Sequence, residues 1–80
     1  MFFFDTRDDG LLIRDDVGLE FSDMETVKVQ AAKSLAELAV DVLPRSMERC
    51  LGVDVRNDRG GDVLTTELIF KAHVLVDTFG

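Results

Sequence analysis

The chain has 80 residues, of which 46% are hydrophobic and 31% are charged, and its formal net charge is −7. This length leaves room for one hydrophobic core, so we expect a single domain over residues 1–80, and the composition is that of a chain that folds. The net negative charge argues against nucleic acid as a partner, because affinity for phosphate backbones comes mainly from lysine and arginine.

Two features of the sequence indicate a cytoplasmic protein. Cys50 is its one cysteine, which excludes the intrachain disulfides typical of small secreted domains. The N-terminus lacks the basic region and the longer apolar run of a signal peptide. Because no stretch approaches the roughly 20 apolar residues of a membrane span, we expect no association with a membrane.

The first predicted element is a β-hairpin. Residues 2–5 form a short aromatic run that favours a strand, residues 6–10 carry turn chemistry, and residues 11–14 form a second apolar run. Gly10 is free to adopt the positive φ that such a loop can require. Residues 15–18, with the sequence DDVG, then end the second strand.

A long amphipathic helix is predicted over about residues 23–43. Ser22 and Glu25 fit the capping box that satisfies free N–H groups at a helix start, and Pro44 ends the helix because it cannot continue the hydrogen-bond ladder. Apolar residues recur at spacings of three and four and so share one helix face: Met24, Val27, Ala31, Leu35, Leu38 and Val42. A rod of this length, near 30 Å, has to lie across a whole sheet.

Two further strands are predicted after the helix. The third covers residues 51–56, residues 57–61 form a tight turn, and the fourth runs over about residues 62–76. The even-numbered residues of the fourth strand are the more apolar, so we expect the helix to cover them. The predicted fold is therefore α+β, ββαββ, with a four-stranded antiparallel sheet and the helix packed on one face.

The predicted fourth strand suggests a homodimer. It is nearly twice as long as the third strand, so half of its backbone groups need another partner. Apolar residues are also expected on the sheet face that the helix leaves uncovered. The candidate interface residues are Phe3, Ile69, His73 and Leu75.

The acidic N-terminal segment supplies candidate metal ligands. Asp5, Asp9 and Asp16 occupy the first, fifth and last places of an EF-hand loop template. The cationic Arg7 stands at the third place, and a phenylalanine-rich strand precedes the loop where a helix should be. An ordinary hairpin turn, in which Asp and Gly are the preferred residues, is the favoured interpretation.

The sequence contains no catalytic signature. His73 and Cys50 are single residues of their types, and their sequence neighbours indicate neither a base nor a reactive thiolate. Asp15 and Asp16 precede a turn and are expected to be solvated, complementing the helix N-terminus. The glycines of residues 57–61 precede a strand, not the helix that a phosphate cradle needs. We therefore expect neither enzymatic activity nor a cofactor.

Short motifs spread over nearly the whole chain are shared with a known family. They are Phe3-Phe4-Asp5, Asp15-Asp16 with Gly18, Leu35-Ala36-Glu37-Leu38-Ala39 with Asp41, Leu43-Pro44, Val53, Val55, Arg56, Gly60 and Val63-Leu64. Together they resemble a family of small uncharacterised alphaproteobacterial proteins, a domain of unknown function. The resemblance implies the same order of elements and a bacterial cytoplasmic setting, and it brings no activity or catalytic residue. The loop over residues 44–50 is more apolar than expected of a member.

Three functions are compatible with these observations. The leading hypothesis is a non-enzymatic interaction or structural module that acts as a homodimer, with its acidic hairpin end available to a basic protein partner. One alternative is a small-ligand or metal-responsive sensor that uses Asp5, Asp9 and Asp16. The other is an antitoxin-like regulator whose acidic surface binds a basic protein.

Overall fold

The computed structural model describes residues 1–76 and confirms the predicted order of elements. Along the chain these are β1 (Phe2–Asp8), β2 (Leu11–Ile13), α1 (Met24–Val42), a 3-10 turn (Leu43–Arg45), β3 (Glu48–Asn57) and β4 (Asp62–Lys71). The strands form one antiparallel sheet in the order β2-β1-β3-β4. The α+β class with one helix on a four-stranded sheet is therefore confirmed.

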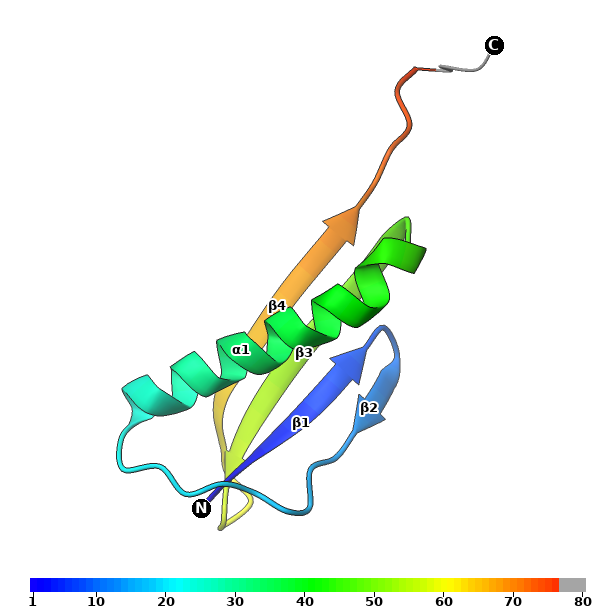
Figure 1. The fold of residues 1–80 in the computed structure, drawn as a ribbon. Helices are drawn as coiled ribbons and strands as arrows, with labels where there is room; N and C mark the ends of the chain where they lie inside the picture. The colour runs from blue at the N-terminus through cyan, green and yellow to red at the C-terminus, as the bar shows by residue number, and fades with distance from the viewer. Residues whose placement is uncertain (77–80) are drawn as a thin grey trace.

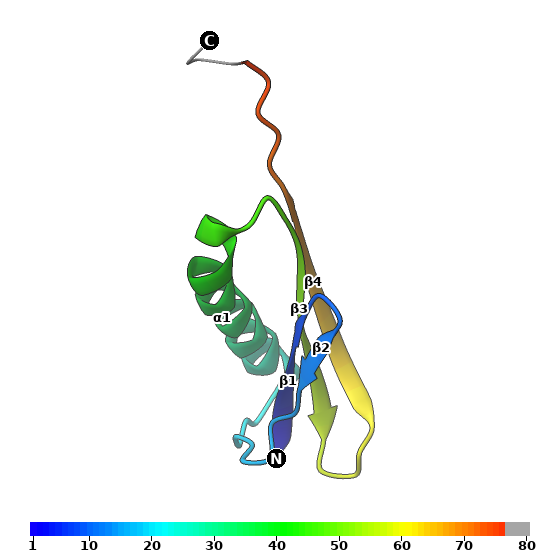
Figure 2. The same cartoon turned by 90° about the vertical axis from the view of Figure 1, so that its right-hand side faces the viewer.

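The helix covers one face of the sheet and leaves the other face bare. α1 runs diagonally across the sheet (Figure 1), and the view turned by 90° shows it on one side only (Figure 2). It packs mainly against β3 and, to a smaller extent, against β4. No helix among residues 1–76 is long and apolar enough to cross a membrane.

The core lies between α1 and the central strand β3. Val53 and Val55 of β3 and Val27 and Ala31 of α1 are fully buried. Valine suits a central strand because its branched side chain packs well on a pleated surface, and residues four apart, such as Val27 and Ala31, share one helix face. Partly buried apolar side chains surround this centre: Phe2, Phe4, Phe21, Leu35, Val63 and Leu64.

The cap of α1 is Asp23, so the predicted cap at Ser22 is wrong by one residue. The Asp23 carboxylate accepts hydrogen bonds from the backbone N–H of Thr26 at 2.8 Å and from its hydroxyl at 2.6 Å. The hydrogen bond from the Thr26 hydroxyl is the largest cause that holds the pKa of Asp23 below its usual range, and the bond from the Thr26 N–H is the second. Glu25 lies in the first turn, where its charge complements the helix dipole.

The predicted difference in length between the last two strands is also wrong. β3 and β4 have 10 residues each, because β3 begins at Glu48, before the predicted start. β4 ends where its neighbour begins, and the last ladder bond runs from the N–H of Ala72 to the carbonyl of Met47 at 2.7 Å. Residues 73–76 then leave the sheet and extend away from it (Figures 1 and 2).

The identity of the cap can be tested by two substitutions. Asp23→Ala should lower the free energy of unfolding by about 1 kcal/mol, because it leaves the Thr26 N–H without its partner. The matched control Ser22→Ala should change it by less than about 0.5 kcal/mol. Urea denaturation followed by circular dichroism measures both values, and a larger loss for Ser22→Ala would return the cap to the predicted position.

Candidate functional site

On the bare face of the sheet, Arg7 of β1 joins three strands. Its Nε lies 2.6 Å from the Asp54 carboxylate on β3, and its Nη2 donates to the carbonyl of Thr66 on β4 at 2.9 Å. The guanidinium crosses directly over Gly52, where a Cβ would lie 2.1 Å from Arg7 Nη2. The hydrogen bond from Arg7 is the main cause that holds the pKa of Asp54 below its usual range.

A second ion pair lies further along the same face, at the other end of β1. Arg56 Nε lies 3.0 Å from the carboxylate of Asp5, which is only 7% exposed. The Arg56 guanidinium also stacks on the Phe3 ring, 4.5 Å from its centroid, and donates to the carbonyl of Asp15 at 2.6 Å. Phe3, a predicted interface residue, is therefore engaged within the chain.

Asp15 is a structural residue, so the prediction that it is solvated is wrong. Its carboxylate accepts backbone N–H bonds from Phe4 at 3.0 Å, Val17 at 3.0 Å and Gly18 at 3.3 Å. Burial acts to raise the pKa of Asp15, but these three donors outweigh it and lower the pKa. Asp16 beside it is exposed.

The outer edge of β1 is thereby closed along most of its length. β2 pairs with residues 6–8, and the Asp15 carboxylate binds the N–H of Phe4 where β2 has ended. Phe2 and Leu19 then exchange two backbone hydrogen bonds of 2.8 Å each. The edge of β4 on the opposite side of the sheet has no such cover among the described residues.

The acidic hairpin turn is tied to the start of β3. Arg49 Nε lies 2.7 Å from the Asp8 carboxylate and 3.3 Å from that of Asp9. Asp9 also accepts the N–H of Cys50 at 2.9 Å, and the positive φ of this turn, 52°, is at Asp9 and not at Gly10. The carboxylates of this turn are engaged with a cation of the same chain.

The three candidate metal ligands do not converge. Asp5 pairs with Arg56 on the bare face, Asp9 pairs with Arg49 at the hairpin turn, and Asp16 is exposed in the loop before the helix. Within residues 1–76, no group of three or more His, Cys, Asp or Glu side chains is placed to hold a metal ion.

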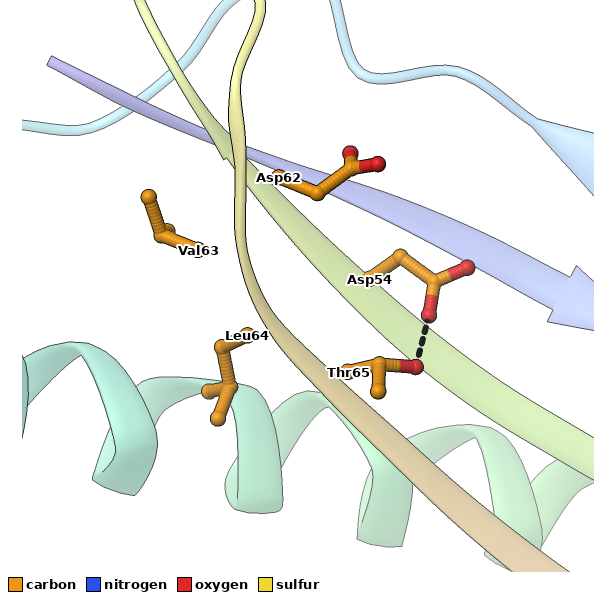
Figure 3. A pocket seen from close by; sticks show the side chains of 5 residues that line it. All are labelled: Asp54, Asp62, Val63, Leu64 and Thr65. Carbon is orange, nitrogen blue, oxygen red and sulfur yellow. Dashed lines mark hydrogen bonds between the residues drawn. The ribbon is translucent and has the colours of Figure 1, made fainter.

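An open hollow of about 500 Å³ lies beside the β3–β4 hairpin, where the strand register shifts between Val55 and Arg56. Figure 3 shows that Thr65 bonds to Asp54, a contact of 2.5 Å, while Leu64 points towards α1. The hollow is lined by Asp54, Asp62, Val63, Leu64 and Thr65. Of its two carboxylates, that of Asp54 is already bound by Arg7 and by the Thr65 hydroxyl.

The remaining predicted interface residues gather along the free edge of β4 and the segment that follows it. Ile69 is 62% exposed on the bare face, and Leu75 is 90% exposed. His73 lies between them and is exposed as well. Their exposure is shown, and their place in an interface stays a prediction; the sequence could not show that β1 is covered and that β4 is the long free edge.

Comparisons with known proteins identify a family. The family model described as Domain of unknown function (DUF6894) matches residues 1–69. Neither the curated proteins nor the solved structures contain a match. The described geometry is therefore the main basis for inferring function.

The crossing of Arg7 over Gly52 can be tested with a pair of glycine variants. Gly52→Ala should lower the free energy of unfolding by about 1–3 kcal/mol, because the added methyl group displaces the guanidinium from Asp54. Gly10→Ala is the matched control, since its Cβ would meet nothing within 4 Å. Chemical denaturation of both variants decides the point, and equal stabilities would contradict it.

Acid should destabilise the protein. The pKa values of Asp8, Asp15 and Asp54 lie below that of an unfolded aspartate, so near pH 4 the unfolded chain binds more protons. Their stabilising effect is complete above about pH 5 and is lost as the pH falls through about 3.9 towards the lowered folded values. Urea titrations from about pH 7 to about pH 3 should show this loss, with a smaller loss in Asp54→Asn.

Proposed function

The chain belongs to the DUF6894 family, a domain of unknown function, and on that premise we propose that it is a non-enzymatic interaction module that acts as a homodimer. The observation that carries the proposal is the asymmetry of the sheet edges. On one side β1 is covered by β2, Asp15 and Leu19, so the outermost strand there is the three-residue β2, whereas the other side presents all 10 residues of β4. A long strand whose outer edge is unpaired is a ready template for pairing with another chain.

The exposed apolar residues near β4 support the same proposal. Val74, Leu75 and Val76 are between 67% and 90% exposed in the segment that extends β4, and Ile69 adds a further apolar side chain at its edge. An exposed apolar strip of this kind is typical of a surface that another protein covers. Short globular chains also gain stability from association, because they bury little surface alone.

The ion pairs of the sheet support a structural role over a catalytic one. Arg7, Arg49 and Arg56 each bind an aspartate of the same chain. Three of the paired carboxylates also accept backbone or hydroxyl hydrogen bonds: those of Asp5, Asp9 and Asp54. Groups held in this way keep their charge and position. A general acid or base instead needs to exchange a proton with a bound substrate.

The alternatives that rely on the acidic segment receive no specific support. A metal sensor would need Asp5, Asp9 and Asp16 together, and a basic protein partner would have to compete with the arginines that already bind Asp5 and Asp9. A homodimer through β4 breaks neither of these ion pairs.

Sedimentation equilibrium tests the proposal. At micromolar concentration the protein should sediment with about twice its chain mass of 8.9 kDa, because a second copy would cover the β4 edge and the apolar segment after it. A species of single-chain mass at every concentration up to about 100 μM would exclude the homodimer.

A further inference from the structure

The backbone of β4 directs half of its hydrogen-bonding groups away from β3. The N–H of Ala72 bonds to Met47 on β3, and in an antiparallel ladder alternate residues face the same neighbour. From Leu64 to Ala72 the even-numbered residues therefore bond to β3, and the bulge before Leu64 interrupts this alternation. The odd-numbered residues, among them Glu67, Ile69 and Lys71, present their N–H and C=O groups to the free edge.

Symmetry restricts how a second copy can pair with this edge. A twofold axis normal to the sheet sets strand against strand antiparallel and keeps both helices on the same side. Because the odd-numbered residues face the free edge in both copies, each odd-numbered residue pairs with an odd-numbered residue of the second copy. The two residue numbers of every facing pair then add up to the same even number. Each permitted register places one β4 residue opposite its own copy.

The charges of β4 distinguish among these registers. With Ile69 opposite Ile69 of the second copy, Glu67 lies opposite Lys71 in both halves of the interface. If the residue that faces its own copy is instead Leu68 or Phe70, Glu67 lies opposite Ile69 or His73, respectively. Moving the centre by two residues sets Glu67 opposite Glu67 or Lys71 opposite Lys71, and facing like charges destabilise a sheet.

The helix side of the joined strands is apolar in the same register. Leu68 lies opposite Phe70 of the second copy, and Leu64 lies opposite its Val74. Cross-strand apolar pairs of this kind stabilise a sheet. The charged pairs therefore fall on the bare face and the apolar pairs on the face that carries the helices.

The centre at Ile69 also uses the whole of the described strand and its extension. It sets Leu64 opposite Val74, so residues 72–74 of one copy lie beside residues 64–66 of the other, and residues 75 and 76 reach the bulge at the start of β4. Residues 73–76, which leave the sheet beyond the last bond to β3, then gain a neighbour. The exposed side chains of Val74 and Val76 gain cover at the same time.

We propose that two copies of the chain join through β4 in the register centred on Ile69, with residues 72–76 of each copy completing the edge of the other. This inference rests on the proposed homodimer and specifies its surface and its register. The two sheets become one continuous antiparallel sheet, with both helices on one side and the Arg7–Asp54 and Arg56–Asp5 pairs on the other.

A cysteine on the twofold axis tests the register. Facing residues of a hydrogen-bonded antiparallel pair have Cα atoms about 5.5 Å apart, which is within disulfide range. Ile69→Cys in a Cys50→Ser background should therefore form a disulfide-linked dimer under mild oxidation. Cys50 is replaced because it lies opposite Ile69 within the chain. The matched control is Ile13→Cys on β2, which is similarly exposed at the other edge.

A charge exchange tests the same register without a covalent bond. Glu67→Lys and Lys71→Glu should each raise the dimer dissociation constant roughly tenfold, since each change places like charges opposite each other twice. The double variant restores opposite charges and should return the constant to near its original value. Circular dichroism of each variant separates a loss of pairing from a loss of folding.

The outcomes separate the register from the homodimer. If the unmodified protein sediments as a dimer but the cysteine at position 69 cross-links no faster than the one at position 13, the inferred register is wrong and the homodimer stands. Failure of the double variant to recover affinity has the same meaning. A single-chain mass at every concentration overturns both proposals.

Discussion

The Asp15 carboxylate determines much of how this small sheet is finished. It accepts the N–H of Phe4 where β2 has already ended. The backbone N–H of Asp15 donates to the Asp5 carboxylate, and the backbone carbonyl of Asp15 accepts a hydrogen bond from Arg56. One residue outside any strand thus closes the edge of β1 and supports the buried ion pair beside it. This cover satisfies backbone groups of β1 that would otherwise lack partners. β4 is then the one long strand of the described sheet whose outer edge is open to association.

The bare face of the sheet is stabilised by charge pairs where other folds use a second apolar layer. Arg7 with Asp54 and Arg56 with Asp5 each connect neighbouring strands, and both arginines also donate to backbone carbonyls. Partly buried pairs are costly unless their remaining hydrogen-bonding groups are satisfied, and here they are. In the described part of the chain, no buried side-chain nitrogen or oxygen lacks a partner.

The sequence predicted those features that depend on local pattern. Helical spacing and Pro44 located α1, and alternation located β3 and the apolar side of β4. The predicted cap position differs from the observed one by a single residue, because Ser22 and Asp23 are both good capping residues. The ion pairs could not be foreseen, since Arg7 and Asp54 are 47 residues apart and meet only through the register of β1 with β3. The same limit made Asp5 and Asp9 look like candidate ligands.

The three-residue strand β2 has a consequence for how far assembly can proceed. Joining two copies through β4 consumes the long edge of each, and the outermost strands are then the two copies of β2. A strand of three residues offers a poor template for further pairing, so sheet growth would terminate at two chains. A fold with a long strand at each border would instead be open to filament formation. In an assembly of this kind, the short outer strand β2 would limit the sheet to two chains.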